Sequence, residues 1–201
     1  MAGDSQIASV QESNGGGGGG EEELNLPTGY RFWPEENELI SHYLTNKLLG
    51  RPLSANIIKD IDLYEYDPHQ LPIDKFRYGM RNEAYYFTNT RPNRTTKNGY
   101  WKAIGEDEQV FGGDGGTEIV GFKKSFNFYW GLEPNGEKRP WIMEEYRLNP
   151  SIIPADALTD SITQKMERLV VCRIQKEEGG DSKNSTLKFI ASDIGGNQND
   201  I

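Results

Sequence analysis

The stretch Val-Gly-Phe-Lys-Lys-Ser-Phe-Asn-Phe-Tyr-Trp at residues 120–130 decides the fold class of this 201-residue chain. Polar and apolar side chains alternate along it, so that Lys124 and Phe126 fall on one face of an extended backbone and Lys123 falls on the other. Alternation with a period of two is typical of a β-strand with one packed face. The stretch therefore predicts a strand of a β-sheet.

Further β-rich runs lie on both sides of this strand, separated in several places by breaks rich in Gly, Asn and Asp. With the first strand included, they occupy residues 84–89, 99–104, 109–111, 119–130, 141–148 and 168–175. Short strands at close spacing with turn signals between them predict a mostly antiparallel meander.

Helices are expected before the sheet. Apolar residues recur at three- and four-residue spacing over residues 39–48, Pro34 suits the first turn, and Gly50 ends the pattern. Ser54 is placed to cap a second short helix over residues 57–61. The predicted fold class is therefore α+β, a twisted and mostly antiparallel sheet flanked by N-terminal helices.

The chain is predicted to divide into one domain and two tails. Residues 1–24 are acidic and glycine-rich, and residues 179–201 are polar, so neither segment has the apolar surface needed to offset its chain entropy. Both are predicted to be disordered, which leaves a single domain over residues 25–178. Within it, residues 149–167 contain two prolines and are expected to form an irregular excursion before the last strand.

Composition excludes several classes of protein. Cys172 is the only cysteine, and with only His42 and His69 beside it the chain has too few ligands for a structural zinc site. Glu144 and Glu145 are adjacent on a predicted strand and point to opposite faces, so they do not form an acid–base pair. No membrane span, metal, cofactor, small-molecule substrate or enzyme activity is expected.

Charge is distributed unevenly along the chain. The net charge is −9, which argues against non-specific coating of nucleic acid by the overall field. Residues 75–105, however, carry seven Lys and Arg against one Glu, a local charge of +6. A basic stretch in an acidic chain remains a plausible footprint for nucleic acid.

The centre of that footprint is residues 91–105, Arg-Pro-Asn-Arg-Thr-Thr-Lys-Asn-Gly-Tyr-Trp-Lys-Ala-Ile-Gly. Its second half, residues 99–104, is predicted to be a short strand opened and closed by glycines, with Tyr100 and Lys102 on one face and Trp101 on the other. Guanidinium and ammonium groups on an aromatic-backed ribbon suit phosphate and groove contacts. The alternative is a solvated basic strand on an ordinary domain.

Several blocks of the chain resemble the NAC-domain transcription factors of plants. They are Leu-Pro-Thr-Gly-Tyr-Arg-Phe at 26–32, Asp-Leu-Tyr at 62–64, Asp-Pro at 67–68, Arg-Pro-Asn-Arg at 91–94, Gly-Tyr-Trp-Lys-Ala at 99–103, Trp-Ile-Met-Glu-Glu-Tyr-Arg-Leu at 141–148 and Val-Cys-Arg-Ile at 171–174. They follow the family order over residues 25–178. The resemblance implies a homo- or heterodimer that acts in the nucleus as a sequence-specific transcription regulator.

The resemblance also implies two sets of site residues. Double-stranded DNA with a CGTG/CACG-type core receives the edge of strand 99–104 in its major groove, and the DNA-binding residues are Arg91, Arg94, Lys97, Tyr100, Lys102, Lys123 and Lys124. Arg31 and Glu38 pair across a two-fold axis in a dimer interface made of Leu26, Pro27, Tyr30, Arg31, Phe32 and Glu38.

The chain departs from the family pattern on the DNA side. A basic insert that usually precedes Arg91 is missing, and residues 104–108 read Ile-Gly-Glu-Asp-Glu where the family has Thr-Gly-Thr-Asp-Lys. If Glu106 or Glu108 faces a phosphate it repels it, and each missing basic residue lowers the counterion-release contribution. A carboxylate can also accept from cytosine N4, which leaves altered specificity open.

These departures motivate an alternative of another class. The chain would then be an interaction protein that heterodimerises with other NAC-type factors through Arg31 and Glu38 and weakens their DNA binding. About twenty residues follow Glu178, where the family usually carries a long activating region. Either the chain is a fragment or activation comes from a partner.

Overall fold

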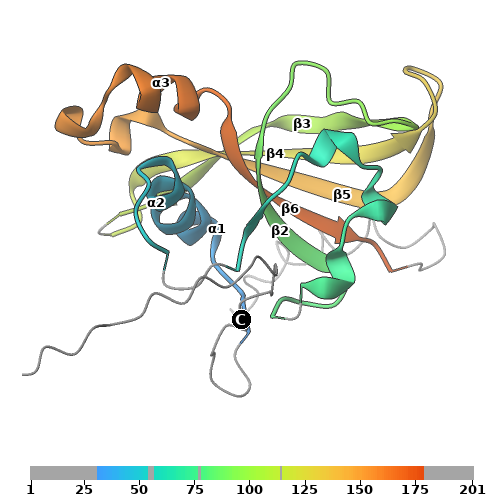
Figure 1. Ribbon diagram of the computed structural model, residues 1–201, viewed down its shortest axis with the longest axis horizontal. Helices are drawn as coiled ribbons and strands as arrows, with labels where there is room; N and C mark the ends of the chain where they lie inside the picture. Colours follow the sequence, from blue (N-terminus) through green and yellow to red (C-terminus); the bar gives the residue numbers. More distant parts are fainter. Residues whose placement is uncertain (1–30, 54–56, 77, 114, 179–201) are drawn as a thin grey trace, which may run out of the picture.

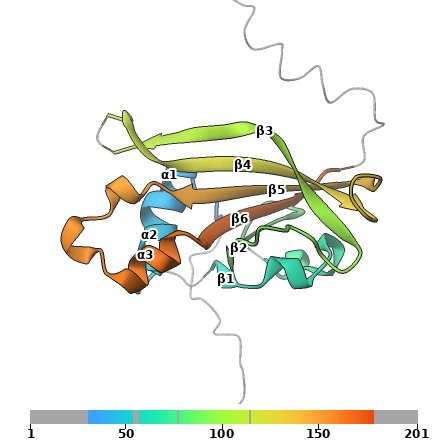
Figure 2. The ribbon, with the colours of Figure 1, turned by 90° about the horizontal axis from the view of Figure 1, so that it is seen from above.

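The computed structural model describes residues 31–53, 57–76, 78–113 and 115–178. Its centre is a six-stranded sheet, most of which can be followed in Figure 1. The strands are β1 (Lys59–Asp60), β2 (Glu83–Asn89), β3 (Gly99–Gly112), β4 (Glu118–Trp130), β5 (Glu137–Leu148) and β6 (Leu169–Lys176). Their order across the sheet is β1-β2-β6-β5-β4-β3. Only the β1–β2 pair is parallel among these strands. Strand β3 therefore forms one border of the sheet, as Figure 2 shows.

A helical run precedes the sheet, as the sequence predicted. It consists of α1 (Glu36–Glu38), the π-helix η1 (Leu39–Leu44) and α2 (Thr45–Leu48). At its start the side chain of Glu38 accepts a hydrogen bond from the Glu35 amide at 2.8 Å, which satisfies one of the free N–H groups of the helix terminus. No helix among the described residues is long and apolar enough to span a lipid bilayer.

Shorter helical pieces complete the domain. The 3₁₀ turns η2 (Leu63–Glu65), η3 (Pro68–Gln70) and η4 (Ile73–Lys75) lie between β1 and β2. Between β5 and β6 the chain forms η5 (Pro150–Ile152), η6 (Ala155–Ala157) and the helix α3 (Asp160–Met166), which packs beside α2. The predicted irregular excursion over residues 149–167 thus contains one short α-helix, capped by the hydroxyl of Thr159.

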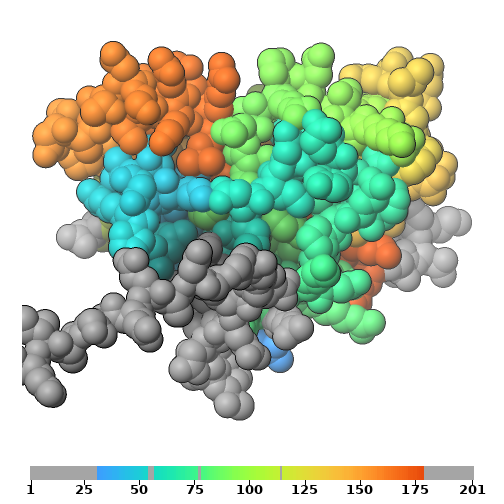
Figure 3. Space-filling view, viewed as in Figure 1, coloured from blue at the N-terminus to red at the C-terminus, as the bar shows by residue number. Residues whose placement is uncertain are grey.

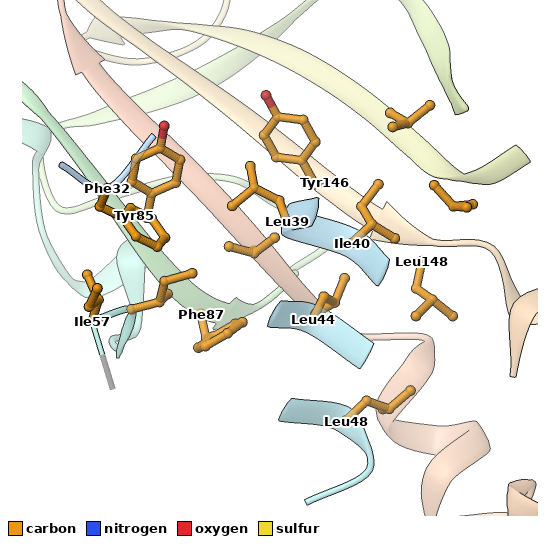
Figure 4. Close-up of a cluster of buried hydrophobic side chains, with 14 of the residues drawn as sticks. Phe32, Leu39, Ile40, Leu44, Leu48, Ile57, Tyr85, Phe87, Tyr146 and Leu148 are labelled. Carbon is orange, nitrogen blue, oxygen red and sulfur yellow. The ribbon is translucent and has the colours of Figure 1, made fainter. Parts of the chain in front are cut away.

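Two hydrophobic cores lie on opposite faces of the sheet. The first joins the helical run to the sheet and includes Phe32, Leu39, Ile40, Leu44, Tyr85, Phe87 and Tyr146 (Figure 4). The second packs η2 and η4 against the other face and includes Leu63, Tyr64, Ala84, Tyr86, Trp101, Phe126, Met143 and Cys172. Neighbours in β2 alternate between the cores, as the strand pleat requires. Each large apolar side chain buried this way contributes about 1.5–3 kcal/mol.

The predicted α+β fold class is confirmed, but one of the predicted helices is wrong. Ser54 lies outside the described residues, and within them Ile57 and Ile58 are buried but belong to no helix. Lys59 and Asp60 then pair with Tyr86 and Phe87 as β1. β-Branched residues such as Ile have low helix propensity, and the edge of β2 provides backbone hydrogen-bond partners for the residues that follow, as in the bond from the Ile61 amide to the Phe87 carbonyl at 3.0 Å.

The predicted short strand over residues 99–104 is also wrong in extent, because it continues through Gly105 to Gly112 as one strand. Ile104 pairs with Ser125, and the next pair is Glu108 with Lys123. Between these pairs β3 advances by four residues while β4 advances by two, so β3 contains two extra residues, which form a bulge. Gly105 accommodates the bulge with a φ of 63°, a conformation that favours glycine. We call residues 105–108 the acidic bulge.

The predicted tails, residues 1–24 and 179–201, lie outside the described residues. The boundaries of the predicted domain at residues 25 and 178 therefore stay predictions. What the structure describes of that range contributes to one sheet and its two cores.

Candidate nucleic-acid interface

The basic stretch lies in the loop between β2 and β3 and folds back on the start of β3. The Thr96 amide donates to the Gly99 carbonyl and the Trp101 amide to the Arg94 carbonyl, both at 2.8 Å. Thr95 also forms an isolated antiparallel bridge with Tyr100. We call residues 91–98 the basic loop. Because β3 is the border strand, this loop stands at the free edge of the sheet.

Arg91 is at the exposed end of the basic loop and is bound to two carboxylates. Its guanidinium donates to Asp62 and, at 2.9 Å, to Glu65, and it lies 5.8 Å from the Tyr64 ring centroid. The hydrogen bonds to Glu65 and Asp62 raise the pKa of Arg91 above its usual value. All three partners of this ion-pair group are solvent-accessible, so a phosphate can reach the guanidinium.

Arg94 forms an ion pair with the buried Glu145. Its Nε and Nη2 atoms donate to Glu145 at 3.1 and 3.0 Å, and its guanidinium lies 4.7 Å from the Phe126 ring centroid. The Glu145 side chain is 1% exposed and that of Arg94 is 26% exposed. Bidentate pairs of this kind are strong and geometrically specific. Arg94 thus ties the basic loop to β5, and its assignment to DNA stays a prediction that this geometry does not favour.

A buried carboxylate holds the other end of the basic loop. Asp67 accepts from the Thr96 hydroxyl at 2.5 Å, from the Asn98 side-chain amide at 2.6 Å and from the Asn98 backbone at 3.2 Å. Burial alone would raise the pKa of the Asp67 carboxyl, but the hydrogen bonds from Thr96 and Asn98 outweigh burial and lower it. Lys97, between these two donors, is exposed and has no carboxylate partner among the described residues.

Tyr100 and Lys102 share one face of β3, as predicted, but they differ in exposure. Tyr100 is 2% exposed and stacks on Tyr129 with 5.4 Å between ring centroids. Lys102 is exposed, and its ammonium lies 5.8 Å from the same ring. Trp101 packs on the opposite face against Phe128. Tyr100 and Lys102 therefore both lie against the Tyr129 ring, and a direct DNA contact by the buried Tyr100 stays an untested prediction.

Lys123 and Lys124 are paired with the acidic bulge. Lys123 contacts Glu108 at 3.0 Å and Glu36 at 2.9 Å, and its side chain is 15% exposed. On the other face, Lys124 contacts Asp107 at 2.9 Å and the Gly105 carbonyl at 3.0 Å. These carboxylates thus form ion pairs with lysines of the same chain. The assignment of Lys123 and Lys124 to phosphate stays a prediction, because each ammonium would first have to leave its carboxylate.

The charges of the acidic bulge are balanced by three cations on the strands that face it, one of which, Lys123, is also paired with Glu36. Asp107 also accepts from Arg147, and its hydrogen bond to Lys124, together with the nearby charges of Arg147 and Lys124, lowers the pKa of its carboxyl. The bulge supplies three carboxylates, Glu106 to Glu108, and the facing strands supply three cations, Lys123, Lys124 and Arg147, which sum to zero. Glu106 is the member of the bulge with no cation partner among the described residues.

The residues predicted for the dimer interface are only partly described. Leu26, Pro27 and Tyr30 lie outside the described residues. Phe32 is 2% exposed in the first core, whereas Arg31 and Glu38 are exposed. A pairing of Arg31 with Glu38 across a two-fold axis therefore stays a prediction.

A cleft of about 1240 Å³ opens between α3 and the end of β2, visible in Figure 3 as the hollow between the orange surface of α3 and the green surface of the basic loop. Its charged lining is mixed and consists of Arg91, Arg94, Lys165 and Arg168 with Asp60, Asp62 and Glu167. This near balance does not favour a polyanion. The described residues also contain no cluster of three or more His, Cys, Asp or Glu placed to hold a metal.

Comparison with known proteins identifies the family. Residues 27–148, more than half of the chain, match the family model of the No apical meristem (NAM) protein. The chain belongs to the NAC family. The resemblance in its opening, basic and Trp-Ile-Met-Glu-Glu-Tyr-Arg-Leu blocks is thereby confirmed.

Curated relatives agree with this assignment to the NAC family. "NAC transcription factor 29" of Arabidopsis thaliana is 40% identical over 162 residues, which cover 77% of this chain and 58% of that protein. "NAC domain-containing protein 68" of Oryza sativa subsp. japonica is 41% identical over 169 residues, covering 80% and 52%. "NAC domain-containing protein 2" of Solanum lycopersicum is 40% identical over 162 residues, covering 77% and 56%. The chain thus spans between about half and three fifths of their lengths.

Some functional partners were not visible in the sequence. In the sequence, nothing about Asp67, Glu145 or Asp107 as single residues sets them apart from the other carboxylates of the chain, yet each holds part of the basic surface in place. Their burial and their partners depend on strands that meet only in the folded chain. Asp67 and Glu145 do lie in blocks of the family resemblance, Asp-Pro at 67–68 and Trp-Ile-Met-Glu-Glu-Tyr-Arg-Leu at 141–148, and that is the hint that the sequence offers.

Proposed function

We propose that this NAC protein is a sequence-specific, DNA-binding transcription regulator that acts as a dimer and presents the β3 edge to the major groove. The observation that carries the proposal is the position of β3 at the border of the sheet with the basic loop beside it. The major groove is about 12 Å wide and admits a two-stranded β-ribbon. A relative that is 40% identical is named a transcription factor, which supports the same class of function.

In this proposal a basic residue is more available to DNA phosphate when no carboxylate of the protein is paired with it. Lys97 and Lys102 have no carboxylate partner among the described residues and bind phosphate directly. Arg91 exchanges Asp62 and Glu65 for phosphate, because the group is solvent-accessible. Arg94 shapes the loop instead of contacting DNA. The contact set is then smaller than the seven residues implied by the family pattern.

The remaining parts of the proposal follow from the family. The protein acts in the nucleus on duplexes with a CGTG/CACG-type core, and two protomers meet through the block that holds Arg31 and Glu38. Both side chains are exposed, which supports their availability to a second protomer. A two-fold dimer places two β3 edges on one duplex.

The test is fluorescence anisotropy of a labelled core duplex and of a scrambled duplex over a series of salt concentrations. Six phosphate contacts, from Arg91, Lys97 and Lys102 of each of two protomers, predict a slope of about −5 in log K against log [salt]. Preference for the core duplex with such a slope supports the proposal. Equal binding to both duplexes would overturn it.

The acidic bulge favours a second candidate function, an attenuated NAC protein that heterodimerises with DNA-binding members and weakens them. Lys123 and Lys124 are held by Glu108 and Asp107, so the protein brings fewer free cations to a mixed dimer. The test is to add the protein to a DNA-bound NAC partner and follow both the partner's oligomeric state and its DNA complex. If neither changes, this candidate is wrong.

A further inference from the structure

The carboxylate of Asp67 is buried and has no ion-pair partner among the described residues, although the charge of the nearby His69 helps to lower its pKa. Asp67 is fully buried, its hydrogen-bond donors Thr96 and Asn98 are neutral, and none of the ion pairs in the described part of the chain includes it. Burial of an unpaired charge is unfavourable unless hydrogen bonds compensate it. This site therefore uses a charged group to hold a turn of only three residues, 96–98.

The same turn is fixed from two further directions. The Gly131 amide, at the end of β4, donates to the Asn98 carbonyl at 2.8 Å, and the Thr96 amide donates to Gly99. Asp67 is itself anchored on η3, where its amide donates to the Gln70 side chain at 2.9 Å. The polar groups of Thr96 and Asn98 are thus directed inward, onto the protein.

Lys97 is the residue between them, and it makes none of the hydrogen bonds to Asp67. It is exposed and is without a carboxylate partner among the residues that the structure describes. A lysine is a flexible point charge, so the position of its backbone decides where the charge is available. Here the backbone on both sides of the lysine is fastened to one buried carboxylate.

We propose that Asp67 is a positioning residue for DNA binding, which acts by holding the 96–98 turn so that Lys97 is presented to a DNA phosphate. This inference rests on the proposed DNA-binding function. Without the hydrogen bonds to Asp67, the turn would have to be ordered when DNA binds, and the loss of backbone freedom would weaken the complex. Asp67 thus affects DNA affinity by fixing the position of Lys97 and does not itself contact DNA.

The experiment is a double-mutant cycle measured by anisotropy on the core duplex, with the full chain in all variants. Thr96→Val removes the hydroxyl that binds Asp67 while keeping the side-chain shape, and Thr96→Ser keeps the hydroxyl. Lys97→Gln removes the charge. We expect Thr96→Val to weaken binding by about tenfold, the effect of ordering roughly one residue. Thr96→Ser should bind like the native protein.

The decisive outcome is the coupling between the two positions. In the Lys97→Gln background, Thr96→Val should change the affinity little, because there is no charge left to position. Lys97→Gln alone should make the salt slope shallower by about 0.9 for each phosphate that the lysine neutralises in the native complex. Thr159→Val is the matched control: it removes a hydroxyl that accepts from Ile162 at 3.2 Å on α3, and it should leave DNA affinity unchanged.

The inference and the proposed function fail in different ways. If Thr96→Val weakens binding equally with and without Lys97, Asp67 supports the domain as a whole and the inference is overturned. If Lys97→Gln leaves the salt slope unchanged while core preference persists, Lys97 is not the residue that Asp67 presents. Loss of core preference in the native protein would instead overturn the proposed DNA-binding function.

Discussion

Replacing Arg94 by Met separates a structural role from a DNA contact. Methionine keeps an unbranched side chain against Phe126 but leaves Glu145, which is 1% exposed, without its bidentate partner. Removing one member of a buried ion pair typically destabilises a protein by about 3–5 kcal/mol. Because Arg94 is 26% exposed, water can partly replace the guanidinium, and we expect the lower end of that range.

A decrease of about 3 kcal/mol is large for a domain of this size. Total stability is commonly about 5–15 kcal/mol, and the melting temperature falls by about 2–4 °C per kcal/mol in domains of 150–250 residues. We therefore expect Arg94→Met to lower the melting temperature by roughly 6–12 °C. Urea denaturation followed by tryptophan fluorescence at neutral pH measures the change in stability.

Two further variants make the test specific. Arg94→Met combined with Glu145→Leu removes both charges and should recover most of the stability, since the unpaired carboxylate is gone. Arg91→Met removes an arginine whose carboxylate partners are exposed and should leave the urea midpoint close to that of the native protein. If Arg94→Met unfolds like the native protein but loses DNA affinity, the guanidinium is a DNA contact and the structural argument is refuted.

Three other predictions concern the acidic bulge and the basic loop. Glu108→Lys should steepen the salt slope of DNA binding by about 0.9 per additional phosphate neutralised. Glu108→Gln removes only one of the two carboxylates paired with Lys123 and should have a smaller effect. An unchanged slope would mean that the acidic bulge lies away from DNA. Gly105→Ala should destabilise the protein by about 1–2 kcal/mol in urea, because residue 105 has a φ of 63°; equal stability would mean that the bulge relaxes. Because the pKa of Asp67 is lowered in the folded protein, its ionised carboxylate stabilises the fold above about pH 4, and this contribution is lost as the pH falls through the lowered pKa. The urea midpoint should therefore fall in acid. In Asp67→Asn, which has no carboxyl group at this position, it should fall less.

The sequence by itself determined the types of the main elements. The apolar spacing over residues 39–48 and the alternation over residues 120–130 correctly predicted a helix and a strand, because one side of each element is buried. Alternation also placed Tyr100 and Lys102 on one face of β3. It failed at Gly105, where a glycine indicates the end of a strand in the sequence but accommodates a bulge in the structure.

Only the tertiary structure decided which charges are free. Arg94 and Glu145 are 51 positions apart, Lys123 and Glu36 are 87 apart, and Asp67 and Asn98 are 31 apart. The strand members of these pairs are Lys123 on β4 and Glu145 on β5, and a shift of one residue in strand register would turn each of them to the other face of the sheet. The sequence therefore locates the basic stretch, whereas long-range strand pairing determines that Lys97 and Lys102 remain available to a partner and that Arg94, Lys123 and Lys124 are held by the protein itself.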